Sequence, residues 1–499
     1  MIVTITQDAV GRRLFDWLVS RGHYIIAPCG GRGTCGKCRV KLLGGLFCDV
    51  VTNEIATPDE SGYILSCQVY CTVDSVGARI SLPSAKGEGL VDFETTHIAK
   101  GEGGYAISLD VGTTTIGACL VDKSSGEIIS KTSMLNPQAV YGADVLSRIQ
   151  ACSEGKLEHL QSLVLDATKE IISTLATDKH IDELCVSANT TMLHLYIGVD
   201  PATIGRYPFS PVFVEEKVLS GESLGLEVDV VRLLPSASAY IGSDVTVGVL
   251  ACDMRVDSTQ LLVDMGTNGE IVLSHGGRLY ATSTAVGPAL EGASIECGVG
   301  GVVGAIDRVR IVDGEIIPHT IGDATPIGIC GSGLVQLTAS LLRLGMIDET
   351  GAWSIESDSP LYKYFRGDRL YLTDDIYLSQ KDVRQLQLAK SALCSGIETL
   401  LIENDVNMDE VNTVYIAGGV GYYIDLDSAS EIGLLPQKLK KVAKVVGNTS
   451  LAGNVNCVLS SEDREKVAKI SREIKVIDLS FSNTFVDKYM ENMYFAEGV

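Results

Sequence analysis

The chain has 499 residues, with 40 basic and 63 acidic side chains, so its formal net charge is −23 at pH 7. This acidity argues against nucleic acid or an anionic membrane surface as the main partner, because both attract basic residues. No run of about 20 apolar residues occurs, so no transmembrane helix is predicted. The first residues also lack the basic-then-apolar layout of a signal peptide. We therefore expect a cytoplasmic protein.

The excess acidity begins after residue 100, because residues 1–100 contain ten basic and ten acidic residues. This change in composition predicts a domain boundary nearby. In the neutral region, short apolar runs predict strands at 2–6, 38–43, 63–69 and 78–82 and a helix at 11–22. We expect a small domain over residues 1–83. Residues 84–104 are rich in Gly and charge and predict a linker, part of which could pair as a strand.

From Tyr105 onward, strands alternate with helices, which is typical of an α/β domain. Apolar residues at helical spacing predict helices at 159–178 and 383–405, and apolar runs predict strands at 106–112, 183–189, 260–266 and 413–419. Residues 106–122 and 260–276 share one plan: an apolar strand, Asp-x-Gly-Thr and a second apolar strand. This internal repeat predicts a duplicated domain with a cleft between its halves, approximately 105–258 and 259–499.

Four cysteines of the first domain predict a metal cluster. Cys29, Cys35 and Cys38 lie in one Gly-rich loop, and Cys67 follows on a predicted strand. The spacing approximates the plant-type iron–sulfur pattern with one extra residue in the first gap, and it resembles [2Fe–2S] ferredoxins of the adrenodoxin kind. The alternative is a structural zinc site on Cys35, Cys38, Cys67 and Cys71. The loop glycines and Cys29 favour the iron–sulfur cluster, since zinc requires neither.

The remaining cysteines and the basic residues of this loop have simpler interpretations. Arg32, Lys37, Arg39 and Lys41 surround the ligands, either as a solvated loop that offsets the cluster's charge or as a docking surface for an acidic redox partner. Most other cysteines lie among apolar residues and are interpreted as packing or buried thiols: Cys48, Cys71, Cys119, Cys185, Cys252, Cys297, Cys394 and Cys457.

Two hairpin turns and two Gly-rich turns predict a nucleotide site in the second domain. The first hairpin offers phosphate donors at Gly112, Thr113, Thr114 and Thr115, and the second at Gly266, Thr267 and Asn268. We expect Asp110 and Asp264 to be the catalytic carboxylates, with Asp110 able to hold Mg²⁺ or a metal-bound water. The turns at Gly331, Ser332 and Gly333 and at Gly418 and Gly419 complete the predicted site.

The order of these motifs resembles the superfamily of acetate and sugar kinases, heat-shock chaperones and actin, which implies two ribonuclease-H-like halves with ATP between them. More specifically, the chain resembles reductive activators of corrinoid enzymes. The stretches that carry this resemblance are 136–149, 187–201, 234–245, 283–298, 379–390, 416–426 and 446–454. The implied fold is an α+β β-grasp ferredoxin-like domain followed by the duplicated ATPase domain.

The resemblance implies ATP-dependent, one-electron reduction of Co(II) to Co(I) in the corrinoid protein of a methyltransferase system. It also implies a low-potential cellular electron donor and allows a homodimer. Two alternatives stay open from the residues alone: a small-molecule kinase with a regulatory cluster, and a ferredoxin-type shuttle whose ATP-like domain only docks.

Four other residues have open roles at this stage. His194 lies in an apolar helix and is interpreted as a core histidine with satisfied hydrogen bonds. Glu291 and Glu296 follow the second hairpin and could position water or Mg²⁺, although a solvated face explains them as well. Cys330 lies at the nucleotide edge, and a bridging [4Fe–4S] role for it is disfavoured because no second cysteine matches it.

Overall fold

A computed structural model describes residues 1–23, 25, 27–59, 61–82, 93, 103–254, 257–419 and 423–495. The N-terminal domain forms a four-stranded sheet in the order β1-β6-β2-β4, a two-stranded sheet of β3 and β5, and one helix. Its elements are β1 Ile2–Thr4, α1 Leu14–Ser20, β2 Arg39–Leu42, β3 Phe47–Asp49, β4 Tyr63–Leu65, β5 Val69–Cys71 and β6 Arg79–Ser81. The α+β prediction is confirmed.

The prediction of one strand over 63–69 is wrong. The chain instead forms β4, a 3₁₀ turn over Ser66–Gln68 and then β5, so Cys67 lies in the turn between two strands that belong to different sheets. Ser66 fixes this turn because both its backbone N–H and its hydroxyl donate to the carbonyl of Cys38, each at 2.9 Å. The turn therefore directs Cys67 back toward the cysteine loop.

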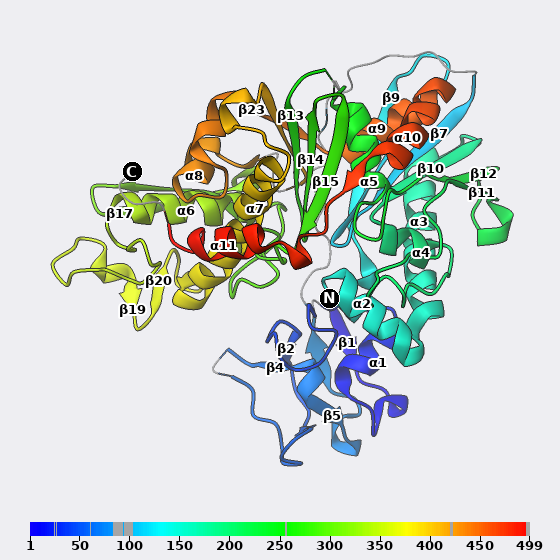
Figure 1. The fold of residues 1–499 in the computed structure, drawn as a ribbon. Coiled ribbons are helices and arrows are strands. Elements are labelled where there is room, and N and C mark those ends of the chain that lie inside the picture. Colours follow the sequence, from blue (N-terminus) through cyan, green and yellow to red (C-terminus); the bar gives the residue numbers. More distant parts are fainter. Residues whose placement is uncertain are drawn as a thin grey trace.

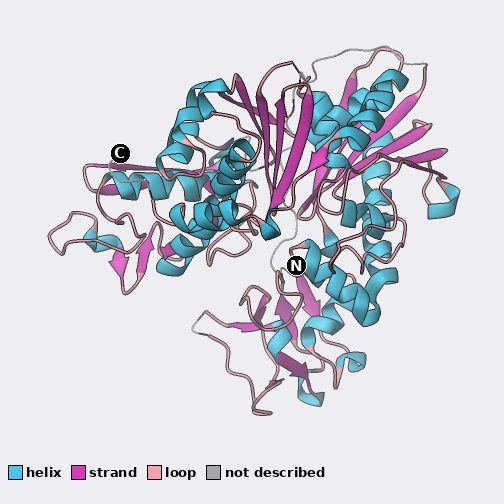
Figure 2. Cartoon of the chain, viewed as in Figure 1, coloured by secondary structure: helices cyan, strands magenta, loops and turns pink. Residues whose placement is uncertain are grey.

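The second domain contains two six-stranded sheets with the same core topology (Figures 1 and 2). The orders are β11-β12-β10-β7-β8-β9 and β23-β22-β13-β14-β15-β24. In each sheet the first three strands form an antiparallel meander. Two further strands, β10 and β12 in the first sheet and β22 and β23 in the second, continue the sheet in parallel from the first strand of the meander. The two Asp-x-Gly-Thr segments form the first hairpin of each meander. The predicted duplication is thus confirmed.

The first half is built from β7 Tyr105–Val111, β8 Thr115–Asp122, β9 Ile128–Leu135, α2 Val145–Ala151, α3 Leu157–Ala176, β10 Glu183–Ala188, α4 Thr190–Tyr196, β11 Lys217–Ser220, β12 Val230–Leu233 and α5 Ser243–Ala251. The helix predicted at 159–178 is α3, and it buries Leu160, Val164, Ala167, Ile171 and Leu175 against the sheet. Its Leu163 instead packs, partly buried, against the core of the N-terminal domain.

The second half begins with β13 Gln260–Met265, β14 Gly269–His275, β15 Arg278–Thr284, β16 Ala305–Val312, β17 Glu315–Thr320, β18 Gly328–Ile329 and α6 Gly331–Arg343. It continues with β19 Phe365–Arg366, β20 Arg369–Tyr371, β21 Tyr377–Ser379, α7 Gln380–Ile402, β22 Thr413–Ala417, α8 Leu426–Glu431 and β23 Ala443–Gly447. The last elements are α9 Thr449–Leu459, α10 Ser461–Glu473, β24 Lys475–Val476 and α11 Asn483–Glu491. The helix predicted at 383–405 is α7.

Two helices lie between the sheets and tie the halves together (Figure 1). The helix α9 follows the second sheet in the chain but packs on the first, where Asn454 donates to the carbonyls of Leu109 and Cys185. The helix α5 follows the first sheet, and its Val245 and Val249 pack with Leu262 and Val272 of the second. The half predicted over residues 259–499 therefore supplies α9, which covers the sheet of the other half.

Most of the predicted linker 84–104 lies outside the described residues. Phe93 is described; it is buried, forms an isolated bridge with Gly447, and lies 4.0 Å from the Lys131 ammonium. Among the described residues, no helix combines the length and the apolar character needed to cross a membrane.

Candidate nucleotide cleft and four-cysteine site

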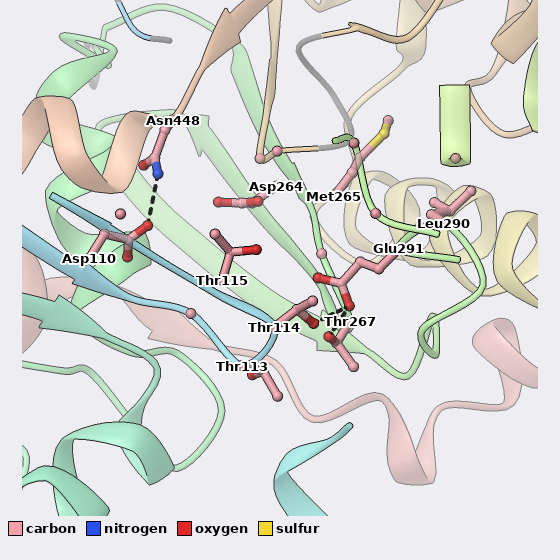
Figure 3. Close-up of a pocket in the computed structure, with 18 of the residues that line it drawn as sticks. Asp110, Thr113, Thr114, Thr115, Asp264, Met265, Thr267, Leu290, Glu291 and Asn448 are labelled. Atoms are coloured by element: carbon pink, nitrogen blue, oxygen red, sulfur yellow. Dashed lines mark hydrogen bonds between the residues drawn. The ribbon is translucent and has the colours of Figure 1, made fainter. Parts of the chain in front are cut away.

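A cavity of about 230 Å³ lies between the two Asp-x-Gly-Thr hairpins (Figure 3). Thirteen of the fourteen predicted residues line it: Asp110, Gly112, Thr113, Thr114, Thr115, Asp264, Gly266, Thr267, Asn268, Gly331, Ser332, Gly418 and Gly419. Gly333 does not line it. A Cβ at Gly333 would lie 2.2 Å from the carbonyl oxygen of Ile306, so this glycine permits close packing of α6 on β16 instead.

The segment that follows β9 holds the first hairpin turn through hydrogen bonds to the carbonyl groups of the turn. Gly112 is required because a Cβ there would lie 2.6 Å from the Thr115 carbonyl oxygen. Asn136 donates from its side chain to the Gly112 carbonyl at 2.8 Å and from its backbone to the Thr114 carbonyl at 2.8 Å. The buried guanidinium of Arg148 donates to the Thr113 carbonyl. The backbone of this turn is therefore held before any ligand arrives.

Glu291 joins the two hairpins across the cleft (Figure 3). Its Oε2 accepts hydrogen bonds from the hydroxyl of Thr114 at 2.8 Å and from the hydroxyl of Thr267 at 2.5 Å. Desolvation raises the pKa of Glu291 above its usual value, although the two hydroxyl bonds oppose this shift. One carboxylate thus occupies the position where both loops offer hydroxyl donors.

Four more carboxylates line the cavity, and none of its described lining residues is Lys or Arg. Asp110 accepts from Asn448 Nδ2 at 2.8 Å and from Ser450 Oγ at 2.7 Å. Desolvation, with a smaller contribution from neighbouring carboxylates, raises the pKa of Asp264 to about 7 and that of Asp244 to about 8. The pKa of Glu270 is raised for the same reasons. Such a site suits a divalent cation, because hard divalent cations prefer oxygen ligands and bind together with the phosphates of a nucleotide.

The other two Gly-rich turns close the cavity. Gly331 and Ser332 begin α6, which is 13 residues long and has Cys330 as its N-cap residue. Gly418 follows β22 with a φ of 92°, and a Cβ there would lie 2.5 Å from Asp264 Oδ1. Gly418 therefore allows the backbone that follows β22 to approach the Asp264 carboxylate.

Several cavity residues were not singled out from the sequence: Asn189, Asp244, Glu270, Tyr423, Asn448 and Ser450. Asn189 caps α4 directly after β10 and donates to the Thr113 hydroxyl at 3.1 Å, and Asn448 caps α9 directly after β23. Polar residues at the carboxyl ends of parallel strands are a known signal for a binding crevice, and both positions carry it.

The four predicted cluster cysteines form two pairs of thiols. The Cys35 thiol hydrogen-bonds the Cys29 sulfur and lowers the pKa of Cys29, and the Cys67 thiol does the same for Cys38. Within the described parts of the chain, metal-type ligand atoms converge in a group of three only at His180, Asp182 and Asp229, on the surface. Cys71 has no thiol among the groups that shift its pKa, which burial raises to about 11.

The backbone of the loop that carries Cys29, Cys35 and Cys38 depends on its glycines. Gly30, Gly31, Gly33 and Gly36 have φ values of 61°, 77°, 82° and 68°, which residues with a side chain rarely adopt. A Cβ at Gly31 would lie 2.6 Å from the Phe15 ring, and one at Gly30 would lie 2.8 Å from the Tyr141 carbonyl oxygen. The loop therefore packs closely on both domains.

The basic residues of this loop do not form one free surface. Lys37 is half-buried, and its ammonium donates to the carbonyls of Ile295 and Glu296, the latter at 2.8 Å. Arg32 donates to the Cys29 carbonyl at 2.9 Å. Arg39 pairs with Asp59 and lies over the Tyr63 ring, which Lys41 also approaches. Lys37 is therefore neither a solvated residue of the loop nor part of an exposed docking surface, so neither interpretation from the sequence holds for it.

The structure shows the surroundings of the residues whose roles the sequence leaves open. His194 is fully buried; its Nδ1–H donates to the Thr190 carbonyl at 2.7 Å, and Nε2 accepts from the Val212 N–H at 3.1 Å. Glu296 accepts from Tyr377 and Arg369 outside the cavity, and Cys330 lines the cavity and contacts Ser332 at 3.2 Å. Most of the predicted buried thiols are buried, but Cys297 and Cys48 are half-buried.

Comparison with known proteins gives the family. The family described as the "C-terminal domain of RACo the ASKHA domain" matches residues 258–498, and the "RACo middle region" matches 105–257. "Corrinoid activation enzyme RamQ" of Eubacterium limosum is 33% identical over 478 residues, covering 90% of this chain and 79% of that protein. The chain belongs to the family of reductive activators of corrinoid proteins.

Two further members of this family of activators support the assignment. The "[Co(II) methylated amine-specific corrinoid protein] reductase" of Methanosarcina barkeri is 24% identical over 442 residues, covering 79% of this chain and 78% of that protein. The solved structure titled "Reductive activator for corrinoid,iron-sulfur protein" superposes with a TM-score of 0.73 at 27% identity, covering 99% of this chain and 96% of that one. The ferredoxin-like plus actin-like fold expected of an activator is therefore established over nearly the whole chain.

Proposed function

We propose that this protein reduces the cobalt of a corrinoid protein from Co(II) to Co(I) in an ATP-dependent reaction. The observation that carries this proposal is the direct contact between the two sites. The cysteine loop of the ferredoxin-like domain touches the same segment, through Ile295 and Glu296, that supplies Glu291 to the nucleotide cleft. An electron carrier and a nucleotide cleft are thus joined within one chain.

ATP is useful in such a protein only when the electron acceptor is harder to reduce than the donor. For a one-electron step, each 59 mV of unfavourable potential difference costs about 1.4 kcal/mol. Cobalt of a corrinoid in the Co(II) state is an acceptor of this kind, because Co(I) lies at very low potential. A nucleotide assists by binding two conformations of the protein with different affinity, which shifts the equilibrium between them.

We propose that Asp110 and Asp264 hold Mg²⁺, directly or through water, and that the two hairpin turns bind the phosphates of ATP. The donor set supports this proposal, because carboxylates face a cavity whose described lining contains no basic side chain to neutralise phosphate. Bound Mg²⁺ supplies positive charge against the phosphate oxygens. The hydroxyls of Thr113, Thr114 and Thr267 donate to the nucleotide, and Asn448 and Ser450 hold the Asp110 carboxylate in place.

We propose that Cys29, Cys35, Cys38 and Cys67 hold a [2Fe–2S] cluster, which supplies one-electron chemistry when bound. The pairing of thiols supports two irons with two thiolates each, whereas tetrahedral zinc requires four ligands around one ion. The glycines of the loop allow its backbone N–H groups to approach the sulfurs. Cys71, which the zinc alternative requires, has a buried thiol whose pKa is raised to about 11 by burial, with no other thiol among the groups that shift it.

The partner that we propose is the corrinoid protein of a methyltransferase system, with a low-potential cellular reductant as electron donor. All fourteen cysteines are free thiols, which favours a reducing compartment, and we propose the cytoplasm. A homodimer is compatible with this proposal and is tested by sedimentation of the purified protein.

The decisive assay mixes the reductant-treated protein with a Co(II) corrinoid protein and follows the Co(I) absorption with and without Mg²⁺–ATP. Formation of Co(I) only with ATP supports the proposal. A small-molecule kinase would instead release a phosphorylated product in the absence of any corrinoid protein. A simple shuttle would reduce cobalt equally with and without ATP, and calorimetry would detect no nucleotide binding.

A further inference from the structure

The loop that carries the cluster cysteines contacts both halves of the nucleotide-binding domain. We call residues 28–38 the cluster loop. On one side, the N–H of Ala143 donates to the Pro28 carbonyl at 3.1 Å, and Gly30 lies against the Tyr141 carbonyl. On the other side, Lys37 donates to Ile295 and Glu296. The cluster loop therefore spans from a segment of the first half to a segment of the second.

Each segment that the cluster loop contacts also contains residues that hydrogen-bond a proposed phosphate-binding turn. The first-half segment begins at Asn136, which bonds the Gly112 and Thr114 carbonyls, and ends at Arg148, which bonds the Thr113 carbonyl. We call residues 288–298 of the second half the coupling segment. It contains Glu291, which bonds both turns, as well as the carbonyls that Lys37 contacts.

The coupling segment is short and tightly held, so it is expected to transmit movement rather than absorb it. The Glu296 N–H donates to Asp382 Oδ1 at 2.7 Å, and Asp382 caps the start of α7 together with Ser379. Turns within the segment are closed by hydrogen bonds from Gly292 to Ala289 and from Gly298 to Ile295, both at 3.0 Å. Only three residues separate Glu291 from Ile295.

Glu291 occupies a position that a nucleotide phosphate would compete for. Its Oε2 takes the two threonine hydroxyls that the hairpin turns offer. A phosphate oxygen requires the same donors, and its negative charge repels a carboxylate at this distance. Glu291 thus holds both turns in the absence of nucleotide and has to yield when phosphate binds.

We infer that Lys37 is a positioning residue that fixes the cluster loop to the coupling segment, and that displacement of Glu291 by a nucleotide phosphate releases this contact. The inference rests on the proposed nucleotide site and adds the regulation of that site. In the nucleotide-free state the cluster loop is held by both halves. In the nucleotide-bound state only the contact with the first half is retained, so the cysteine-bearing face next to Lys37 becomes available to a partner.

Hydrogen–deuterium exchange on the full-length, cluster-loaded protein tests this inference, with a non-hydrolysable ATP analogue and Mg²⁺ as the probe. We expect the analogue to slow exchange at residues 110–115 and 264–268 and to accelerate it at 30–38 by at least about tenfold, because a hydrogen bond from a charged donor contributes at least that factor. In Lys37→Met, exchange at 30–38 should already be fast without nucleotide, with an unchanged cluster absorption spectrum.

Two further variants distinguish the contact between Lys37 and the coupling segment from a general loss of stability. Lys41→Met removes a neighbouring lysine whose ammonium lies 5.7 Å from the centre of the Tyr63 ring in the same domain, and it should behave as the unmodified protein. Glu291→Ala should show fast exchange at 30–38 without nucleotide, although it leaves Lys37 intact.

Three results would overturn the inference. Slowed exchange at both turns with no change at 30–38 would support the nucleotide site and contradict the release of the Lys37 contact. No change at either turn would contradict both the proposed nucleotide site and the release of the Lys37 contact. Equal effects of Lys37→Met and Lys41→Met would show that the contact with the coupling segment has no special role.

Discussion

The cluster loop and the nucleotide cleft are built in opposite ways. Three of the four cluster cysteines lie within ten residues of sequence, and one turn between two short strands brings in the fourth. The cleft instead draws its side chains from segments between Asp110 and Ser450, on both halves of a duplicated domain. The four thiols of the first site all belong to one small domain, whereas the second site is made by two halves and responds to any change in the angle between them.

The largest effect that we predict separates the two sites completely. Cys38→Ser should abolish the cluster absorption and all cobalt reduction, because an alcohol replaces a thiolate ligand. Nucleotide binding, measured by calorimetry, should be retained, since Cys38 lies outside the cleft. Cys71→Ser is the matched control and should keep the cluster, because Cys71 is not one of the four proposed ligands. Loss of the cluster in Cys71→Ser would favour the zinc-type ligand set.

A substitution in the cleft should give the converse result. Asp264→Asn should lower the rate of ATP-dependent cobalt reduction by at least about 100-fold, the size of effect that follows removal of one preorganised group that stabilises charge in a transition state. The cluster spectrum should stay unchanged. The rate is measured by the Co(I) absorption at saturating ATP. A rate within twofold of the unmodified protein would contradict the assignment of Asp264 as a catalytic carboxylate.

A weaker change should expose the dependence of the cleft on distant segments. Asn448→Ala removes the 2.8 Å hydrogen bond to Asp110, although Asn448 is 338 residues away in the chain. A hydrogen bond to a charged group contributes about 1.5–3 kcal/mol, so nucleotide affinity should fall about tenfold or more. Calorimetric titration with the non-hydrolysable analogue measures this. Unchanged affinity, with α9 still folded, would mean that Asp110 needs no support from α9.

The smallest effect concerns pH and involves His194 in the nucleotide-binding domain. Burial lowers the pKa of His194 below its ordinary value near 6.5, and protonation would cost the hydrogen bond that Nε2 accepts from Val212. The contribution to stability is therefore complete above pH 6.5. It is lost as the pH falls below that value, because the unfolded chain then binds a proton that the folded chain does not.

Denaturant unfolding at pH 7.5 and pH 5.5 measures this effect, which we expect to be about 1 kcal/mol, the size of one hydrogen bond. His194→Gln should reduce the loss at acid pH, because its amide does not titrate. His180→Gln, at an exposed histidine of the same half, should not reduce it. If His194→Gln lost as much stability between pH 7.5 and pH 5.5 as the unmodified protein, other groups would be responsible for the effect.

The difference between the two sites also explains what could be predicted from the sequence. The proximity of Cys29, Cys35 and Cys38 was predictable because all three lie within one short loop of the sequence. The duplicated hairpins were predictable because each carries its own strand–turn–strand pattern. The roles of Asp244, Asn448 and Ser450 were not, because they reach the cavity only through the return of α9 to the first sheet and the placement of α5 between the sheets.

Two corrections have the same physical origin. Gly333 follows a Gly-rich pattern, yet its lack of a side chain serves the packing of α6 on Ile306 rather than the cavity. Lys37 is charged and flanked by ligand cysteines, which suggests an exposed position, yet its ammonium is held by two carbonyls of the second half. In both cases a contact with a sequence-distant residue decides the role.

The central claim is that ATP is required for electron transfer from the cluster on this chain to corrinoid cobalt. The most direct test is the electron paramagnetic resonance signal of Co(II) in a corrinoid protein, recorded after mixing with the reduced, cluster-loaded protein. The account predicts that the signal disappears when Mg²⁺–ATP is present and persists when it is omitted or when Asp264→Asn is used. Disappearance of the signal at the same rate without ATP would contradict the account.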